Sequence, residues 1–359
     1  MAALNYMPTI TENWRPYYES SGPMKPEDNT GCPWFHLELN SHCNLSCSLC
    51  PAGNKDGYIF TKGQMPLEFV ERAFDKIATE HPHPSIRCYG YSEPFLYPWL
   101  PEIIISAKRR GFVFELSSNF NHMPRLEEVM AAGPDYLLVG FSGWTQDTYA
   151  KSHKGGDIEK VRANMIKVAG LRSKYPIRVL ANYHVYTDNR GEEMEAAKTF
   201  ITNCGFEWCP TPARAISIEN TIAYLRHIDK ANGLEVPSMG TCQNGFNWDE
   251  ILPSVSANYL EQIQRLTFSP AWAKDFYNKW PVPEVCPLKD IGCFIRWDGK
   301  VTFCATQMDR RLDIGNYLDM TQQQMRDARA KDHPICKECL RYRYNLYCCL
   351  VDYDIWDWK

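Results

Sequence analysis

The chain has no hydrophobic stretch that could cross a membrane. No apolar run approaches the roughly 18 residues that a membrane span needs. Residues 1–30 are polar, rich in proline and without the apolar core of a signal peptide. Positive charge is not in excess either, because 39 Lys and Arg residues stand against 43 Asp and Glu residues. These absences predict a cytoplasmic protein whose partners include neither membranes nor duplex nucleic acid.

Cysteine, in contrast, is plentiful, with 15 residues in a chain of 359. An odd number of cysteines without a secretory signal favours thiols and metal ligands in a reducing compartment over a disulfide framework. Five of them are isolated, and we interpret these as small buried hydrophobic side chains: Cys32, Cys88, Cys204, Cys209 and Cys242. The others form two groups, which are the first candidates for chemistry.

The first group is the stretch CNLSCSLC, which contains Cys43, Cys47 and Cys50. A structural zinc site closes with four ligands, and no fourth ligand is evident here, because the adjacent His42 is expected to point elsewhere. Three thiolates instead suit a metal site with an open position, such as a 4Fe–4S cluster whose fourth iron is free to bind a ligand. A structural zinc site or a redox-sensing thiol loop is the alternative.

Strand and helix patterns alternate along residues 34–212. The segments with strand patterns are 34–39, 85–91, 112–120, 136–143, 177–186 and 206–212. The segments with helix patterns are 67–78, 100–110, 125–133, a helix capped by Asp157, and 191–205. This alternation predicts an α/β fold with a parallel sheet, and six strands fit a partial barrel better than an eightfold one. The cysteine loop follows the first strand, so we expect it at the carboxyl ends of the strands, where the sites of such folds lie.

In this position, CNLSCSLC resembles the CxxxCxxC signature of the radical S-adenosylmethionine (radical SAM) enzymes. The resemblance covers residues 34–212 and implies that the barrel is a partial (β/α)6 TIM-like barrel, the radical SAM core. It also implies that Cys43, Cys47 and Cys50 bind a 4Fe–4S cluster, whose open iron takes the amino and carboxylate groups of SAM. An electron from the cluster would then cleave SAM to methionine and a 5′-deoxyadenosyl radical.

Three further stretches are similar to segments of this family that contact SAM. The stretch GYSEP, residues 90–94, is similar to the GGEP-like motif that holds the SAM amino group, although it lacks the paired glycines. The stretch SSN, residues 117–119, matches the polar end of the third strand, and GFSG, residues 140–143, resembles the family segment SVDG. The resemblance therefore implies these cofactor-binding residues: Gly90, Ser92, Glu93, Ser118, Asn119 and Ser142.

The second cysteine group comprises Cys286, Cys293, Cys304, Cys336, Cys339, Cys348 and Cys349. An Asp-Gly turn within residues 297–300 predicts a hairpin that follows Cys286 and Cys293 and ends at Cys304. The spacing of the whole group resembles the SPASM or Twitch extension of radical SAM enzymes. That extension holds one or two auxiliary 4Fe–4S clusters, so the resemblance implies at least one auxiliary cluster here.

Two ligand sets for an auxiliary cluster stay open. A Twitch-like site would use Cys286, Cys304, Cys336 and Cys339. A SPASM-like site would use Cys286, Cys293, Cys304 and Cys349, and would leave Cys336, Cys339 and Cys348 for a partial second site. Sites of four thiolates suit zinc equally well, so a structural zinc site is the alternative.

These patterns divide the chain into an irregular arm at 1–30, the radical SAM core barrel at 31–214, a bridging segment at 215–285 and a small α+β SPASM/Twitch-like domain at 286–359. The bridging segment is aromatic and irregular, with one helical stripe at Leu260, Ile263 and Leu266, and we expect it to cross the barrel mouth. In the fifth strand, alternation places Asn182, His184 and Tyr186 on one face.

The resemblance thus implies a radical SAM enzyme that abstracts hydrogen from a C–H bond of its substrate. We expect a small polar metabolite, of the sugar, aminoglycoside or nucleoside type, because no separate peptide-recognition domain precedes the barrel. Oxidation, epimerisation or rearrangement would follow. The expected cofactors are SAM, the SAM-binding 4Fe–4S cluster and at least one auxiliary 4Fe–4S cluster, with a reducing partner such as flavodoxin or ferredoxin. The alternatives are a peptide-modifying maturase and, in another class, a non-catalytic iron–sulfur or zinc-binding protein.

Overall fold

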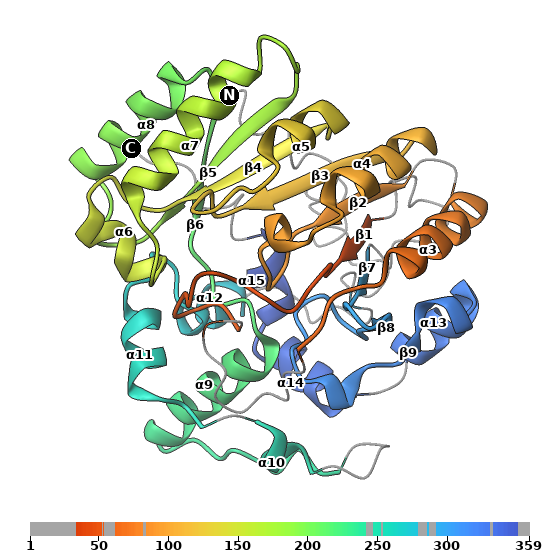
Figure 1. Ribbon diagram of the computed structural model, residues 1–359. Coiled ribbons are helices and arrows are strands. Elements are labelled where there is room, and N and C mark those ends of the chain that lie inside the picture. Colours follow the sequence, from red (N-terminus) through yellow and green to blue (C-terminus); the bar gives the residue numbers. More distant parts are fainter. Residues whose placement is uncertain are drawn as a thin grey trace.

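A single sheet forms the centre of the computed structural model, which describes residues 34–51, 53, 62–81, 84–241, 247–252, 254–278, 286, 292–330 and 333–350, with the main chain alone at 251, 349 and 350. Within these residues the sheet has nine strands in the order β6-β5-β4-β3-β2-β1-β7-β8-β9. Figure 1 shows helices packed along the outer side of the sheet and a second group of helices beyond its lower end. The predicted arm at 1–30 lies outside the described residues.

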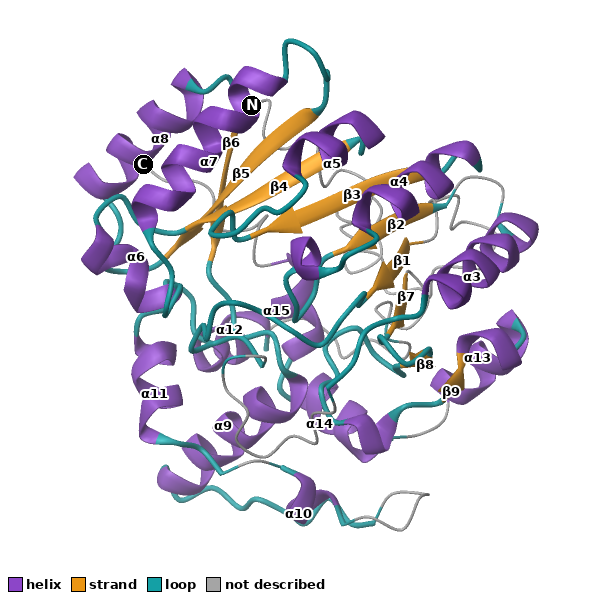
Figure 2. Ribbon diagram, viewed as in Figure 1, coloured by secondary structure: helices purple, strands orange, loops and turns teal. Residues whose placement is uncertain are grey.

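Six parallel strands form the barrel wall: β1 (Trp34–Leu37), β2 (Ser85–Cys88), β3 (Val113–Ser118), β4 (Tyr136–Phe141), β5 (Arg178–Val185) and β6 (Glu207–Pro212). The helices between them are α3 (Leu67–Glu80), α4 (Leu100–Arg109), α5 (Leu126–Ala132), α6 (Gln146–Ser152), α7 (Ile158–Leu171) and α8 (Glu192–Asn203). Figure 2 shows this alternation of strands and covering helices. The predicted α/β fold with a partial barrel is therefore confirmed.

Local sequence explains why these elements form. Helix α3 buries Val70, Phe74 and Ile77, whose spacing of three and four residues places them on one face. Asp157 caps α7 as predicted, because its carboxylate accepts hydrogen bonds from two main-chain N–H groups of the first turn (3.0 and 3.3 Å). Strand β2 is buried along its whole length, as expected for a parallel strand covered on both faces.

The C-terminal hairpin extends the barrel sheet. Strand β7 (Gly292–Ile295) pairs in parallel with β1 and places Cys293 opposite Phe35. Strand β8 (Lys300–Val301) then pairs antiparallel with both β7 and β9 (Gly315–Asn316). The expectation that Cys293 precedes the hairpin is wrong, because Cys293 lies within β7. The sequence indicates the hairpin but carries no local signal for the distant strand with which it pairs.

The bridging segment is helical, and the prediction of an irregular segment is wrong. Its described part contains α9 (Ile218–Ala231), α10 (Trp248–Ile251), α11 (Ala257–Gln264) and α12 (Pro270–Tyr277). Each of these helices begins after an Asn or Ser whose side chain accepts a hydrogen bond from a main-chain N–H of the first turn. Helix α9 buries Glu219, Asn220 and Thr221 beside its apolar residues, and these polar residues obscure the apolar period. The chain continues with α13 (Gln322–Ala330), α14 (Pro334–Arg341) and α15 (Tyr344–Leu350).

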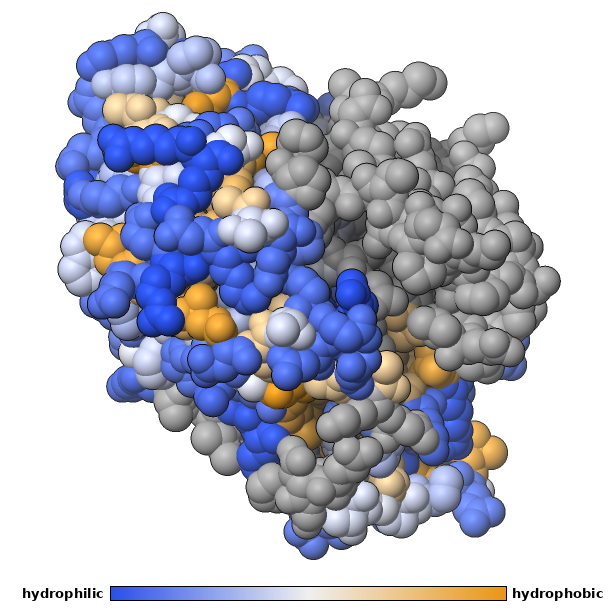
Figure 3. Space-filling view, turned by 90° about the vertical axis from the view of Figure 1, so that its right-hand side faces the viewer, coloured by the Kyte–Doolittle hydropathy of each residue, from blue (hydrophilic) through white to orange (hydrophobic). Residues whose placement is uncertain are grey.

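Two large apolar clusters stabilise the molecule. The barrel apolar cluster lies between the sheet and the barrel helices and includes Phe35, Phe74, Leu116, Val139 and Cys293. The C-terminal apolar cluster lies among the bridging helices, α14 and α15, and includes Ile222, Tyr259, Phe303, Cys304, Cys339 and Tyr347. In the part of the chain that the structure describes, no helix has the length and apolar character of a membrane span. The coloured part of the face drawn in Figure 3 is mainly hydrophilic, with apolar side chains scattered over it.

A buried carboxylate joins the bridging helices to the segment after Cys304. Glu219, near the start of α9, accepts hydrogen bonds from the main-chain N–H groups of Met308 (2.9 Å) and Asp309 (3.0 Å). The hydroxyl of Ser217 also donates to Glu219 (3.1 Å). Burial raises the pKa of Glu219, and these hydrogen bonds act in the opposite direction. The carboxylate therefore fixes the position of α9 relative to the C-terminal hairpin.

We predict that Glu219→Ala destabilises the protein by about 3 kcal/mol, because it leaves two buried N–H groups without an acceptor. Urea unfolding of the iron-free protein, followed by circular dichroism, measures the change. Glu235→Ala is the matched control, since Glu235 is exposed and its replacement should change the free energy of unfolding by less than about 0.5 kcal/mol. Equal effects of the two substitutions would contradict the role assigned to Glu219.

Candidate metal centre and cofactor pocket

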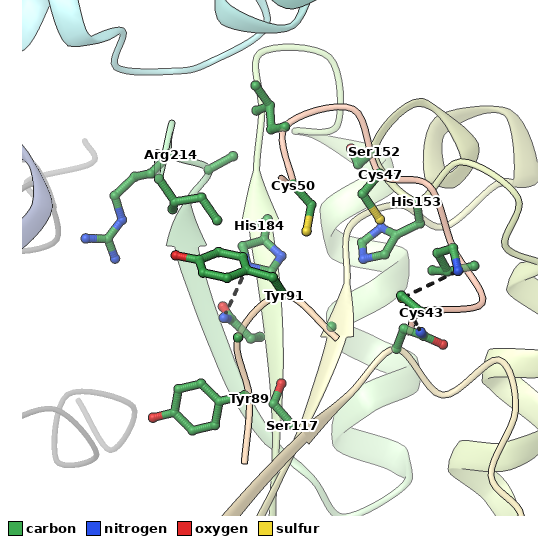
Figure 4. Close-up of a pocket in the computed structure, with 18 of the residues that line it drawn as sticks. Cys43, Cys47, Cys50, Tyr89, Tyr91, Ser117, Ser152, His153, His184 and Arg214 are labelled. Atoms are coloured by element: carbon green, nitrogen blue, oxygen red, sulfur yellow. Dashed lines mark hydrogen bonds between the residues drawn. The ribbon is translucent and has the colours of Figure 1, made fainter. Parts of the chain in front are cut away.

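A cavity of about 520 Å³ opens at the carboxyl ends of the barrel strands. Its wall is formed by the loops after β1 and β2 and by the ends of β3 to β6, which is where parallel α/β folds place their sites. The C-terminal region contributes to the wall as well, since Thr306 and Cys348 line the cavity. Figure 4 shows the three cysteines of the first group together on one side of this space. The predicted location of the cysteine loop is therefore the location observed.

Main-chain hydrogen bonds hold the cysteine loop. The N–H of Cys50 donates to the carbonyl of Cys47 (3.2 Å), and the N–H of Gly53 donates to the carbonyl of Cys50 (2.9 Å). On the outer side, the N–H of Ser46 donates to the carbonyl of Lys154 (2.9 Å). Position 53 has no space for a side chain, because a Cβ atom there would lie 2.2 Å from the carbonyl oxygen of Cys47. The shape of the loop therefore depends on this close approach.

The thiols of the loop lie near one another and are partly buried. Burial raises the pKa of Cys47, and the thiols of Cys50 and Cys43 raise it further. Three thiolates in such a place need positive charge nearby, which iron supplies. Among the described residues, no three His, Cys, Asp or Glu side chains are placed to hold a single metal ion. A 4Fe–4S cluster offers each thiolate its own iron, so this donor set fits such a cluster.

Glu93 directs its carboxylate at the protein main chain. Its Oε2 accepts a hydrogen bond from the N–H of Asn119 (2.9 Å), and its Oε1 accepts one from the N–H of Phe95 (3.2 Å). Burial raises the pKa of Glu93 from 4.5 to about 7, although these hydrogen bonds lower it. The N–H of Glu93 in turn donates to the carbonyl of His42 (2.8 Å). Glu93 therefore joins the ends of β2 and β3 to the start of the cysteine loop.

The residues expected to contact SAM fall into two sets. Those that line the cavity are Gly90, Ser92, Glu93, Ser118 and Asn119. The side-chain amide of Asn119 donates to Oδ1 of Asn44 (2.9 Å) and lies 3.8 Å from Sγ of Cys43, so it contacts the cysteine loop directly. Ser142 differs from these residues, because it is fully buried and does not line the cavity. Its hydroxyl shares a hydrogen bond with Nδ1 of His184 (3.1 Å).

A row of polar side chains crosses the ends of β5 and β6. The hydroxyl of Thr211 donates to Oδ1 of Asn182, and Nδ2 of Asn182 lies 3.3 Å from Nε2 of His184. Burial, and then the positive charge of Arg214, lower the pKa of His184 to about 4. The imidazole is therefore neutral near pH 7. The predicted alternation agrees with this wall, since Asn182, His184 and Tyr186 all line the cavity.

Sequence reasoning missed His153, which also lines the cavity. His153 follows α6, a short helix that the apolar pattern did not predict, and its ring stacks on that of Tyr149 at 4.6 Å. Burial, and then His184, lower the pKa of His153 to about 3. Its buried Nδ1 has no hydrogen-bond partner among the described residues. The one local signal was Thr145, a good N-cap residue that does cap α6.

Cys339 interacts electrostatically with four other thiols of the second cysteine group. Burial raises the pKa of Cys339 well above its usual range, and the thiols of Cys286, Cys336, Cys304 and Cys348 raise it further. Helix α14 contributes Cys336 and Cys339, and α15 contributes Cys348. The other three cysteines of the Twitch-like set and Cys348 therefore lie within electrostatic range of Cys339. As at the first loop, no three of these side chains are placed to hold a single metal ion among the described residues.

The two remaining candidates of the second group differ from these five. Cys293 lies in the barrel apolar cluster, where burial raises its pKa and Arg329 lowers it. The structure thus does not place Cys293 beside Cys339. The side chain of Cys349 lies outside the described residues.

With this geometry established, comparison with known proteins identifies the family. Residues 37–201 match the family model described as the Radical SAM superfamily. Residues 37–201 therefore form a radical SAM domain. This domain marks the chain as an enzyme and implies a 4Fe–4S cluster and SAM as cofactors. The resemblance found in CNLSCSLC is confirmed.

Individual relatives are distant. The chain is 28% identical over 111 residues to the tungsten-containing aldehyde ferredoxin oxidoreductase cofactor-modifying protein of Pyrococcus furiosus, and the match spans 30% of this chain and 30% of that protein. Among solved structures, SuiB of Streptococcus suis bound to precursor peptide SuiA has a TM-score of 0.53 at 11% identity, with 85% of this chain and 66% of SuiB covered. BtrN in complex with AdoMet and 2-DOIA has a TM-score of 0.44 at 13% identity, with 88% and 89% covered. At such identities the likeness to SuiB is one of fold.

We predict that Gly53→Ala prevents the cysteine loop from closing, because the added Cβ would meet the main chain of Cys47. After anaerobic reconstitution, iron per chain should fall by roughly one cluster, about four atoms, while circular dichroism stays close to wild type. Gly170→Ala is the control, since a Cβ at this position in α7 has open space around it and should stabilise the helix by up to about 1 kcal/mol. Wild-type iron content in the Gly53→Ala protein would refute the close-approach argument.

Glu93 should make stability depend on pH. The pKa of Glu93 is raised from 4.5 to about 7 in the folded state. Between pH 4.5 and pH 7 its carboxyl group therefore keeps a proton in the folded state and loses it in the unfolded state. The contribution of Glu93 to stability should therefore fall as pH rises from 4.5 to 7, by up to about 3 kcal/mol, and stay constant above pH 7. Urea unfolding of iron-free wild type and Glu93→Gln across this range measures the difference. Parallel pH profiles would show that Glu93 does not titrate in this range.

Proposed function

We propose that this enzyme reductively cleaves SAM and abstracts a hydrogen atom from a C–H bond of a small polar metabolite of the sugar, aminoglycoside or nucleoside type. Oxidation, epimerisation or rearrangement of that metabolite would be the outcome. One observation carries the proposal: the thiols of Cys43, Cys47 and Cys50 and a row of neutral polar side chains share one cavity of about 520 Å³. This volume is in the range of small-molecule sites.

In this proposal Cys43, Cys47 and Cys50 hold the catalytic 4Fe–4S cluster. When bound, the cluster supplies the electron that cleaves SAM to methionine and a 5′-deoxyadenosyl radical. The chain itself places the ligands: Glu93 fixes the main chain at Asn119, and Asn119 contacts the loop beside Cys43. Gly90, Ser92 and Ser118, which also line the cavity, would contact SAM directly. Ser142 would act through His184, to which it is hydrogen-bonded.

The walls of the cavity support a polar substrate, because most of their polar side chains are neutral. The guanidinium of Arg214 also lies in the wall, where it donates to the carbonyl of Cys348 (2.8 Å). Asn182 and Thr211 present amide and hydroxyl groups. His153 and His184 have pKa values of about 3 and about 4, so both rings are neutral near pH 7. Hydroxyl and amide groups of a sugar or a nucleoside can pair with such donors and acceptors. Enclosure by the C-terminal region would keep water away from a radical intermediate.

We further propose that residues 286–359 form a SPASM/Twitch-like domain with an auxiliary 4Fe–4S cluster. The ligand set that we favour is Cys286, Cys304, Cys336 and Cys339, the Twitch-like set, whose first three thiols all affect the pKa of Cys339. Cys348 also affects this pKa and is the alternative ligand. Cys293 is left out because it lies in the barrel apolar cluster. The auxiliary cluster would then accept an electron from the substrate or help to hold it. A reducing partner such as flavodoxin or ferredoxin would supply the electron for SAM cleavage.

The first experiment compares wild type with a Cys43/Cys47/Cys50→Ala variant, both reconstituted anaerobically. We expect wild type to form 5′-deoxyadenosine from SAM when dithionite is present, and the variant to form none. The variant should still bind about four iron atoms per chain at the C-terminal thiols, about half of the wild-type content. Iron and sulfide analysis and chromatography of the nucleoside products provide the readouts.

Other results would direct the proposal elsewhere. Zinc in place of iron, or bound iron without SAM cleavage, would leave a metal-binding protein that performs no radical chemistry. Loss of all iron in the variant would remove the auxiliary cluster from the proposal. Faster 5′-deoxyadenosine formation with a short peptide than with any sugar or nucleoside would favour a peptide-modifying maturase.

A further inference from the structure

The cysteine loop contacts the C-terminal region at two points. Leu49, the residue before the third cysteine, packs against the C-terminal apolar cluster. Cys50 packs against a small third cluster formed by Tyr91, Phe294 and Met308. Phe294 lies in β7 and Met308 lies after Cys304, so both contacts reach beyond the barrel core.

The same C-terminal apolar cluster contains thiols of the second group. Cys304 and Cys339 are buried members of it, with 8% and 6% exposure, and Cys336 and Cys348 pack against it. Cys304 and Cys339 therefore belong to the core of the same apolar cluster against which Leu49 packs. Protein interiors are closely packed, so a change in the spacing of these thiols changes the packing around their neighbours.

The loop has two other apolar contacts, because Leu45 is buried, with 7% exposure, and Cys50 packs against the third cluster. Asn44 and Ser46 are exposed, and the hydrogen bonds of Ser46 and Gly53 fix the main chain on either side of the segment from Cys47 to Cys50. Between Cys47 and Cys50, Leu49 is the side chain that packs against the C-terminal apolar cluster.

We infer that Leu49 is a positioning residue through which the C-terminal thiol group controls the catalytic cysteine loop. Metal binding at the C-terminal thiols restricts the packing of the C-terminal apolar cluster. This packing restricts the position of Leu49, and Leu49 in turn holds Cys50 and Cys47 in the conformation that binds iron. Loading of the second site therefore promotes loading of the first, and by thermodynamic linkage the first promotes the second equally. This inference rests on the proposed function, because it takes both thiol groups to be iron sites.

The test is a double-mutant cycle on cluster loading. Cys336→Ser/Cys339→Ser removes the second site, and Leu49→Ala removes the connection. Loading of the first site is measured as the fraction of chains whose reduced electron paramagnetic resonance signal changes when SAM is added. Hydrogen exchange of peptides that cover residues 43–53 gives a second readout, which does not depend on activity.

We expect removal of the second site to lower first-site loading at least about fivefold in wild type, within the usual range of coupling between sites. Leu49→Ala should lower loading to a similar extent, and the double cysteine substitution should then have no further effect. Leu49→Met should restore loading, because Met fills a similar volume. Exchange of residues 43–53 should be fast in every protein with low loading.

Leu260→Ala is the matched control, because Leu260 packs against the same apolar cluster from α11. It should lower stability yet keep the coupling between the two sites. Two results would overturn the inference. One is equal loading of the first site in Leu49→Ala and Leu260→Ala. The other is that Cys336→Ser/Cys339→Ser lowers first-site loading by the same factor whether residue 49 is Leu or Ala. If wild type loads both sites and cleaves SAM but shows no coupling between the sites, this inference is wrong and the proposed function stands. If the electron paramagnetic resonance signal of wild type does not change when SAM is added, the proposed function itself is wrong.

Discussion

The parallel pairing of β1 with β7 is the constraint on which the arrangement of both thiol groups depends. Strand β1 leads directly into the cysteine loop, and β7 leads into the hairpin that carries Cys304. Because the two strands run in parallel, the chain leaves both at the same edge of the sheet. That edge is the carboxyl edge, where the cavity lies. One backbone ladder thus brings two distant parts of the chain to the same space.

Buried carboxylates then fix the loops at this edge. Glu93 binds the main chain at Asn119 and Phe95, and Glu219 binds it at Met308 and Asp309. In each case one side chain satisfies two N–H groups that would otherwise be buried without an acceptor. Such groups position the walls of the cavity and need not touch a ligand. Glu93 shows that a residue within a cofactor motif can serve the motif by holding its neighbours.

The sequence predicted what short-range patterns determine. The barrel elements followed from apolar periodicity and caps such as Asp157, and the cysteine loop followed from its own spacing. The bridging helices escaped prediction because α9 buries residues such as Glu219, whose partners are distant in sequence. His153 escaped because its role depends on the neighbouring strands that close the cavity. Prediction therefore failed where the environment of a residue is set by contacts across the fold.

The position of Cys293 shows how tertiary pairing separates ligand sets that spacing leaves open. The register places Cys293 beside Phe35 and Phe294 beside His36. Successive side chains of a strand point to opposite faces, so these two pairs face different layers. Cys293 and Phe35 lie in the barrel apolar cluster, whereas Phe294 stacks on His36 and on Tyr91, a residue of the cavity wall. A shift of one residue in the register would exchange these faces.

Pairing with β1 therefore directs the thiol of Cys293 into the core. Cys304 lies beyond the hairpin, and it is this cysteine that interacts electrostatically with Cys339.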